Sequence, residues 1–324
     1  MSPGRGAPPE PQVVSALREE LVALGLWEIL EDPELTDLVL HGEVVFVTTL
    51  GRGTYRAELS PDPVGIESLI ASVASLNDRF IEPGSPILEA RLPFWNLRVE
   101  AIVPPASERP ILALRKPPAT RLSLQDLVER GTLSQEQARE LSEAVAERKT
   151  IAISGGTGSG KTTLLIALLD DLLSRETSER LVILEEGARE IHVDGDNVLR
   201  LLTSPEAGVD MRRLVRTALR LAPDRIIVGE VRGAEAHDWI KSCATGHPGS
   251  LCTLHASSAE DTLARLDELV QEAGVPSQST RIARVLDLVV FLERHGMRRR
   301  VIELTRIAIS SAFSSRRDLK QTSD

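Results

Sequence analysis

The sequence has few aromatic residues and more acidic than basic side chains. Aromatic residues make up 3% of its 324 positions, and the formal net charge is −10. A protein that tracks a nucleic-acid strand needs basic surface against the phosphates and aromatic rings against the bases. Both deficits argue against broad nucleic-acid binding, and we expect no direct, sequence-specific nucleic-acid partner.

Cysteines and long apolar runs are also scarce. The two cysteines, Cys243 and Cys252, lack the spacing of a metal site and do not imply a disulfide framework. The longest apolar runs, such as residues 288–292, are far shorter than a membrane span. Residues 1–11 lack the apolar core of a secretory signal peptide. We therefore expect a cytoplasmic protein without a transmembrane segment.

What the sequence does contain is the complete pattern G-x-x-x-x-G-K-[ST], from Gly155 to Thr162. Its glycines let backbone N–H groups approach an anionic phosphate, Lys161 supplies a charge for the β- and γ-phosphates, and the Thr162 hydroxyl is a ligand for Mg²⁺. A strand-like run precedes the pattern and an apolar helix follows it, which a flexible linker would not have. We expect nucleotide contacts from Gly155, Gly156, Thr157, Gly158, Ser159, Gly160, Lys161, Thr162 and Thr163. The pattern predicts a nucleoside triphosphate site.

The hydrophobic periodicity predicts two domains. Residues 13–116 combine helical spacing at both 13–24 and 64–76 with short alternating strands, which indicates a small α+β domain. After a proline-rich linker at 117–120, strands and helices alternate over residues 121–309. This alternation predicts an α/β domain with a doubly wound, mostly parallel sheet, ending in a hairpin. Residues 1–12 are predicted to be a disordered lead and residues 310–324 a polar tail.

Two apolar strands of the second domain end in carboxylates. Residues 225–230 form a Walker B arrangement with Glu230 at its end, where a carboxylate can hold a metal-bound water or accept a proton from an attacking water. Residues 181–186 end in Glu185 and Glu186, which could orient water or complete a magnesium shell. The alternatives are a helix-capping role for Glu230 and a solvated acidic turn for the pair.

Two histidines flank the strand predicted near residues 251–254. His247 and His255 could donate hydrogen bonds to a γ-phosphate oxygen and so distinguish triphosphate from diphosphate, or they could be structural. No cysteine or carboxylate cluster completes a four-ligand set, so a zinc site is rejected.

Three of these stretches together resemble a known family. Residues 155–163, 223–233 and 245–256 are similar to the Walker A, Walker B and His boxes of the secretion (traffic) ATPases, in the order and spacing of that family. The sequences of these boxes are most similar to those of the conjugative-transfer ATPases of type IV secretion systems. Residues 30–37, 103–105 and 114–117 resemble the N-terminal domain and linker of those proteins. The resemblance covers about residues 15–306.

The resemblance implies a RecA-like ATPase that uses ATP and Mg²⁺ and assembles as a homohexamer of two-domain subunits. It also implies arginines of the N-terminal domain that reach the phosphates, which by motif are Arg98 and Arg115. The family also has an Asp box, which reads Glu-Asp followed by a short turn and Glu-Leu. This box aligns with residues 185–191 in two registers. One makes Glu185 the family glutamate, and the other makes it Glu186.

The function implied is a motor that energises a type IV secretion or conjugative transfer machine, peripheral at the inner membrane and in contact with its components. A pilus-assembly or type II secretion ATPase is the alternative within this class. A RecA-like nucleic-acid motor is a second class, with the basic residues 294–300 as its best candidate patch, although a solvated hairpin turn is the favoured interpretation. The carboxylates Glu185, Glu186 and Glu230 argue against a third class, a regulatory nucleotide binder without turnover.

Overall fold

The computed structural model describes residues 12–49, 51–95, 97–116, 121–175, 177–187, 190–296 and 298–307. The chain divides into two compact units, Met1–Thr120 and Arg121–Asp324. The linker predicted at 117–120, the tail at 310–324 and residues 1–11 of the predicted lead lie outside the described residues. Residue 12 is not part of a lead, because it begins the first helix.

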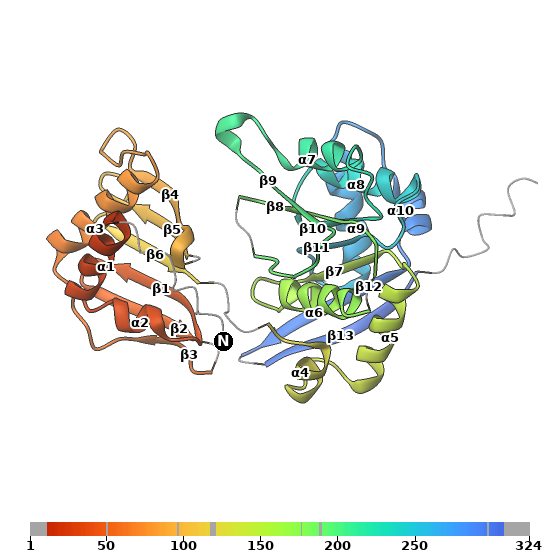
Figure 1. The fold of residues 1–324 in the computed structure, drawn as a ribbon, viewed down its shortest axis with the longest axis horizontal. Coiled ribbons are helices and arrows are strands. Elements are labelled where there is room, and N and C mark those ends of the chain that lie inside the picture. Colours follow the sequence, from red (N-terminus) through yellow and green to blue (C-terminus); the bar gives the residue numbers. More distant parts are fainter. Residues whose placement is uncertain are drawn as a thin grey trace, which may run out of the picture. The chain divides into compact units, whose positions relative to one another are not determined.

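The first unit is built on a six-stranded antiparallel sheet with the strand order β3-β2-β1-β6-β5-β4 (Figure 1). Its strands are β1 (Leu35–His41), β2 (Val44–Thr49), β3 (Gly53–Arg56), β4 (Ile87–Leu92), β5 (Leu97–Ile102) and β6 (Ile111–Arg115). Its helices are α1 (Gln12–Ala23), α2 (Trp27–Glu31), α3 (Pro63–Leu76) and the 3₁₀ turn η1 (Pro93–Trp95).

The spacing of hydrophobic residues in each strand and helix determines which side chains form the core of this unit. Leu38 and Leu40 alternate along β1 into one buried cluster, which also receives Leu17 and Leu21 from one face of α1. The predicted meander is confirmed by the antiparallel β1–β2 and β2–β3 pairs. Strand β4 was not predicted, because only its second and last residues are buried and its alternation is irregular. It pairs along its whole length with β5, the next strand in the chain.

The second unit is a seven-stranded sheet with the order β13-β12-β7-β11-β10-β8-β9 (Figure 1). The pairs from β12 through β9 are parallel and the β12–β13 pair is antiparallel. The strands are β7 (Ile151–Gly155), β8 (Leu181–Glu185), β9 (Val198–Leu202), β10 (Arg225–Val231), β11 (Leu251–Leu254), β12 (Leu288–His295) and β13 (Arg298–Arg306). The mixed α/β architecture with a mostly parallel sheet agrees with the sequence prediction.

Helices cover both faces of this sheet. The helices are α4 (Leu124–Glu129), α5 (Gln135–Ala146), α6 (Lys161–Leu173), α7 (Met211–Ala218), α8 (Glu235–Ala244), α9 (Ala259–Gln271) and α10 (Ser279–Val285), with the 3₁₀ turn η2 (Pro205–Ala207). Ile151 and Ile153 of β7 pack in one core with α5 and α6, while Ala152 packs in a second core with α7, α8 and α9. Short parallel strands buried on both faces account for their nearly continuous apolar sequences.

A capping box sets the start of α5. It was predicted and is present, with the Ser134 hydroxyl accepting from the Gln137 N–H and the Gln137 side chain accepting from the Ser134 N–H. Elements α4, β9 and α10 were not predicted.

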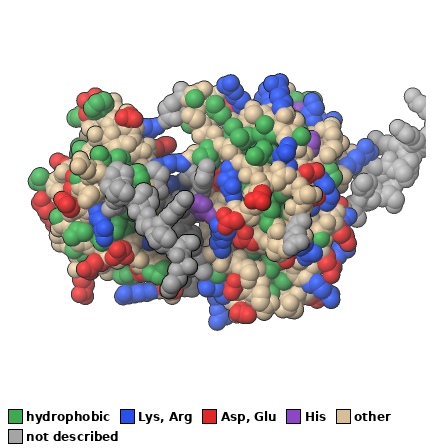
Figure 2. Space-filling view, in the orientation of Figure 1, with side chains coloured by type: hydrophobic (Ala, Val, Ile, Leu, Met, Phe, Trp, Pro, Cys, Tyr) green, Lys and Arg blue, Asp and Glu red, His purple; other side chains and the backbone are tan. Residues whose placement is uncertain are grey.

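Among the described residues, no helix has both the length and the apolar character needed to cross a membrane. On the face shown in Figure 2, acidic and basic side chains are interspersed over this unit.

Candidate functional site

The P-loop joins the carboxyl end of β7 to the start of α6. Gly155 has a φ of 146°, and a Cβ placed on it would lie 2.1 Å from the carbonyl oxygen of Leu292. Gly160, the residue before α6, has a φ of 98° in the left-handed region. The backbone conformation therefore requires glycine at both positions. The loop leads into a 13-residue helix whose positive N-terminal end favours an anion.

Lys161 lies in the first turn of α6 and is buried, with only 7% of its surface exposed. Its Nζ donates to the carbonyl oxygens of Gly155 and Gly156, each at 3.0 Å, and lies 3.5 Å from Nδ1 of His255. Burial lowers the pKa of this ammonium, and the nearby charge of Glu230 opposes that shift. Thr162 and Thr163 follow in the same turn and are half-buried.

The donor set of the loop fits a phosphate group. The Ser159 hydroxyl is buried and has no hydrogen-bond partner among the described residues, so a hydroxyl donor is left for an anionic ligand. At Gly156 a Cβ would have no atom within 4 Å, so this part of the loop is open to a ligand. The Thr162 hydroxyl is the group of this loop that would hold Mg²⁺.

Glu230 lies at the carboxyl end of β10, with Arg232 close to one of its oxygens and His255 close to the other. Oε2 accepts from Nε of Arg232 at 2.9 Å and from Nη2 at 2.5 Å. Oε1 lies 2.7 Å from Nε2 of His255 but, like Oε2 of Glu185, is buried without a hydrogen bond to a described residue. Because His255 Nδ1 also faces Lys161, this histidine lies between the P-loop lysine and the Walker B carboxylate. The structure therefore brings Lys161, His255 and Glu230 together.

Glu185 and Glu186 lie one strand away, at the end of β8, in different environments. Glu185 is 4% exposed, and its Oε1 accepts from the backbone N–H groups of Glu190 and Ile191 at 2.7 and 2.8 Å. Its Oε2 is buried without a hydrogen-bond partner among the described residues. Burial is the largest influence and raises the pKa of Glu185, while the two backbone bonds lower it. Glu186 is exposed and pairs with Nη1 of Arg232.

The structure does not bring His247 to this site. His247 precedes β11, and its Nδ1 lies 2.9 Å from the carbonyl oxygen of Pro223, which precedes β10. Both residues therefore lie at the amino ends of parallel strands, whereas the P-loop and Glu230 lie at the carboxyl ends. The prediction of a phosphate contact from His247 was wrong within the subunit's own site. The sequence placed the two histidines at opposite ends of one strand, and the structure shows that only its carboxyl end, with His255, lies beside the P-loop.

Arg98 and Arg115 belong to the first unit. They are directly opposite each other on β5 and β6, and Arg91 on β4 is opposite Arg98. Asp37 is opposite Arg115 on β1, with its Oδ1 4.0 Å from the Arg115 Nε.

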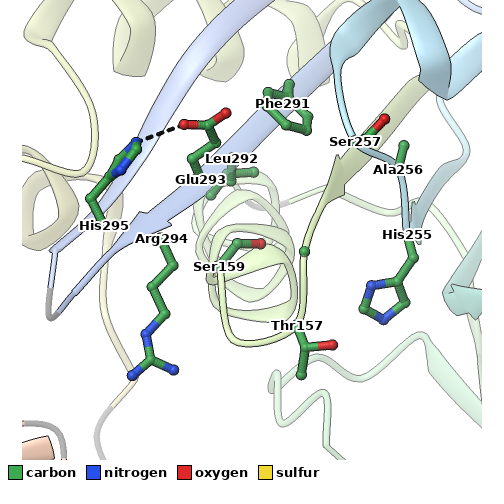
Figure 3. Close-up of a pocket in the computed structure, with 11 residues that line it drawn as sticks. Thr157, Ser159, His255, Ala256, Ser257, Phe291, Leu292, Glu293, Arg294 and His295 are labelled. Atoms are coloured by element: carbon green, nitrogen blue, oxygen red, sulfur yellow. Dashed lines mark hydrogen bonds and ion pairs between the residues drawn. The ribbon is translucent and has the colours of Figure 1, made fainter.

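A pocket of about 720 Å³ opens beside the P-loop (Figure 3). Its walls come from three places: Thr157 and Ser159 of the loop, the segment around His255 after β11, and the end of β12 from Phe291 to His295. Figure 3 shows His255 and Arg294 on opposite sides of Thr157. The basic cluster at 294–300 is therefore not only a solvated turn, because part of it lines this pocket.

The sequence interpretation missed three arginines of the site. Arg232 bridges Glu230 and Glu186. Arg299 donates from Nε to the Gly158 carbonyl at 2.9 Å. Arg294 lies against the same glycine, with Nη1 3.1 Å from the position of a Cβ on Gly158. The only signal in the sequence was the basic character of residues 294–300 and the position of Arg232 two residues after Glu230.

Comparisons with known proteins agree with this geometry. Residues 72–305 match the family described as "Type II/IV secretion system protein". The chain is similar to the probable conjugal transfer protein TrbB of Sinorhizobium fredii, at 36% identity over 92% of this chain and 90% of the relative. It is also similar to the type IV secretion system protein VirB11 of Brucella suis, at 32% identity over 82% of each chain. The fold resembles the X-ray structure of the Legionella pneumophila ATPase DotB, with a TM-score of 0.62 at 22% identity, covering 95% of this chain and 84% of that one.

Proposed function

The chain belongs to the type II/IV secretion system protein family, and we propose that it is a RecA-like P-loop ATPase whose hydrolysis of ATP energises a conjugative transfer or type IV secretion machine. The observation that carries the proposal is the convergence of Lys161, His255 and Glu230 at the carboxyl end of one parallel sheet. This is the edge at which open α/β sheets bind their ligands.

In the proposed site the P-loop binds the phosphate chain. The N–H groups at the start of α6, the Ser159 hydroxyl and the Lys161 ammonium all favour an anion. Lys161 would exchange its two carbonyl partners, Gly155 and Gly156, for phosphate oxygens. Mg²⁺ held at Thr162 would offset charge on the phosphates.

Glu230 is the proposed general base. Its carboxylate would accept a proton from the attacking water, for which one oxygen must be released from its present partners. His255 is placed to control this release, because it contacts both Glu230 Oε1 and the ammonium of Lys161. A γ-phosphate that draws His255 away would free Oε1 and so couple triphosphate binding to base activation.

The test separates binding from turnover. Lys161→Ala should abolish nucleotide binding or turnover, because the phosphates lose their buried counter-charge. Glu230→Gln should retain nucleotide affinity and lose hydrolysis by about 10²-fold or more. Calorimetric binding and steady-state phosphate release would measure both, with Lys241→Ala, an exposed lysine on α8, as the control. Near-normal ATP hydrolysis by Lys161→Ala would contradict the P-loop assignment.

The proposed motor is cytoplasmic and peripheral at the inner membrane, where components of the transfer machine would be its partners. The names of its relatives, a conjugal transfer protein and a type IV secretion protein, support this setting. In the native cell, a Lys161→Ala allele should abolish transfer. If transfer persisted and pilus assembly failed, the pilus-assembly alternative would replace this proposal.

A further inference from the structure

The hairpin of β12 and β13 extends past the P-loop. Strand β12 pairs in parallel with β7, and Leu292 is opposite Gly155, the last residue of β7. The remaining residues of β12, Glu293 to His295, therefore continue alongside the loop that follows β7. The pairing places Arg294 and Arg299, which are opposite each other on β12 and β13, next to the P-loop.

Arg294 and Arg299 differ in their contacts with the P-loop. The Arg299 side chain packs 3.2 Å from the position of a Cβ on Gly160 and donates to the Gly158 carbonyl, so it braces the loop. Burial is the largest influence on Arg299 and lowers its pKa, and the charges of Arg294 and Arg130 lower it further. Arg294 donates from Nε to the Gly296 carbonyl at 2.9 Å. Its terminal nitrogens form no hydrogen bond with a described residue.

The charge of this arginine pair is not neutralised by the described residues. None of the carboxylates among them forms an ion pair with Arg294 or Arg299. The nearest acidic neighbour along the strand, Glu293, is paired with Nε2 of His295 at 2.6 Å. Arg294 is exposed and Arg299 is partly buried. Two guanidinium groups beside an anion-binding loop, without a carboxylate partner among the described residues, favour an anionic ligand such as a phosphate.

We propose that the β12–β13 hairpin supplies a second cationic contact to the phosphate chain of the nucleotide, with Arg294 binding phosphate oxygens and Arg299 positioning the P-loop. The inference rests on the proposed function, because it takes a nucleoside triphosphate as the ligand. Glu230 near the end of β10 and His255 after β11 lie on one side of β7, and the hairpin lies on the other side. The phosphate chain would therefore be held from both sides of the loop.

The experiment compares two ligands that share a phosphate chain, ATP and inorganic tripolyphosphate. Arg294→Ala should weaken the binding of both by about tenfold, equivalent to ~1.4 kcal/mol. Arg294→Lys should recover part of this loss, because a point charge remains without the planar fork. Arg298→Ala removes an exposed arginine from the same hairpin and should leave both affinities unchanged.

Two results would overturn the inference. The first is unchanged affinity of Arg294→Ala for both ligands. The second is a loss for ATP that tripolyphosphate does not show, since this would place Arg294 against the nucleoside. Neither result affects the P-loop assignment, which fails only if Lys161→Ala keeps normal nucleotide binding and turnover.

Discussion

At the residue scale, three carboxylates close to one another have different surroundings and are expected to have different roles. Glu230 has a cation on one oxygen and a histidine on the other. Glu186 is exposed and forms an ion pair with Arg232, which also pairs with Glu230. Glu185 is buried and keeps one oxygen without a partner among the described residues. Of the two registers open in the sequence, this environment favours Glu185 as the functional acid.

Glu185→Gln should therefore reduce turnover by about 10²-fold, whereas Glu186→Gln should change it much less. The amide keeps the acceptor for the N–H groups of Glu190 and Ile191 but cannot carry charge or take a proton. Steady-state ATPase rates at saturating nucleotide would measure the difference. A deep defect in Glu186→Gln with a normal rate in Glu185→Gln would favour the other register.

The same Glu185 variant should gain stability above the ordinary carboxyl range. Because the pKa of Glu185 is raised above 4.5 in the folded protein, the folded state binds more protons than the unfolded state as pH rises past that value. Stability of the wild type then falls with pH through this group, and the amide removes that fall. Thermal unfolding should show a higher Tm for Glu185→Gln at about pH 8, with a difference that shrinks as pH approaches 4.5. A difference that grows on acidification would contradict the buried, raised pKa.

At the element scale, a buried ion pair joins β10 to the segment before β8. Arg225 is 1% exposed and its Nε lies 2.6 Å from Oε2 of Glu179. Arg225 also donates to the Val145 carbonyl at the end of α5, and Arg148 contacts the other oxygen of Glu179 at 2.8 Å. This cluster lies at the amino ends of the strands, opposite the P-loop, and fixes where β10 begins.

Glu179→Ala should lower the free energy of unfolding by about 3–5 kcal/mol, because it leaves Arg225 buried without its counter-charge. Denaturant unfolding would measure this effect. Glu268→Ala breaks an exposed pair with Arg265 and should cost less than about 1 kcal/mol. Equal effects of the two substitutions would show that the buried pair has no special role in anchoring β10.

At the scale of the whole molecule, the family resemblance implies a homohexamer and arginines of the first unit that reach the phosphates of the nucleotide. Arg91, Arg98 and Arg115 are opposite one another across three strands. We propose that ATP binding and subunit assembly are coupled through these side chains.

ATP or a non-hydrolysable analogue should therefore promote a homohexamer, and ATPase activity per subunit should rise with protein concentration. Arg98→Ala and Arg115→Ala should weaken this coupling, whereas Arg56→Ala, an exposed arginine on β3, should not. Light scattering and activity over a dilution series would test this. A fully active monomer at all concentrations would contradict the proposed assembly.

The sequence by itself determined the P-loop, the carboxylate at the end of β10 and the alternation that gives a mostly parallel sheet. These features are local, because a glycine pattern or a hydrophobic period is complete within a few consecutive residues. It also placed most helices and strands to within a few residues, but it missed α4, β4, β9 and α10. In β4 and β9 too few residues are buried to give a regular hydrophobic period.

Only the tertiary structure decided which side chains meet. The pairing of β12 with β7 places Leu292 beside Gly155, although more than a hundred residues separate them in the sequence. The same pairing brings Arg294 and Arg299 to the P-loop. His247 and His255 flank β11, and the parallel alignment of β11 with β7 places only His255 beside the P-loop. Arg232 joins Glu186 to Glu230 because β8 and β10 are neighbours in the sheet although they are far apart in the chain.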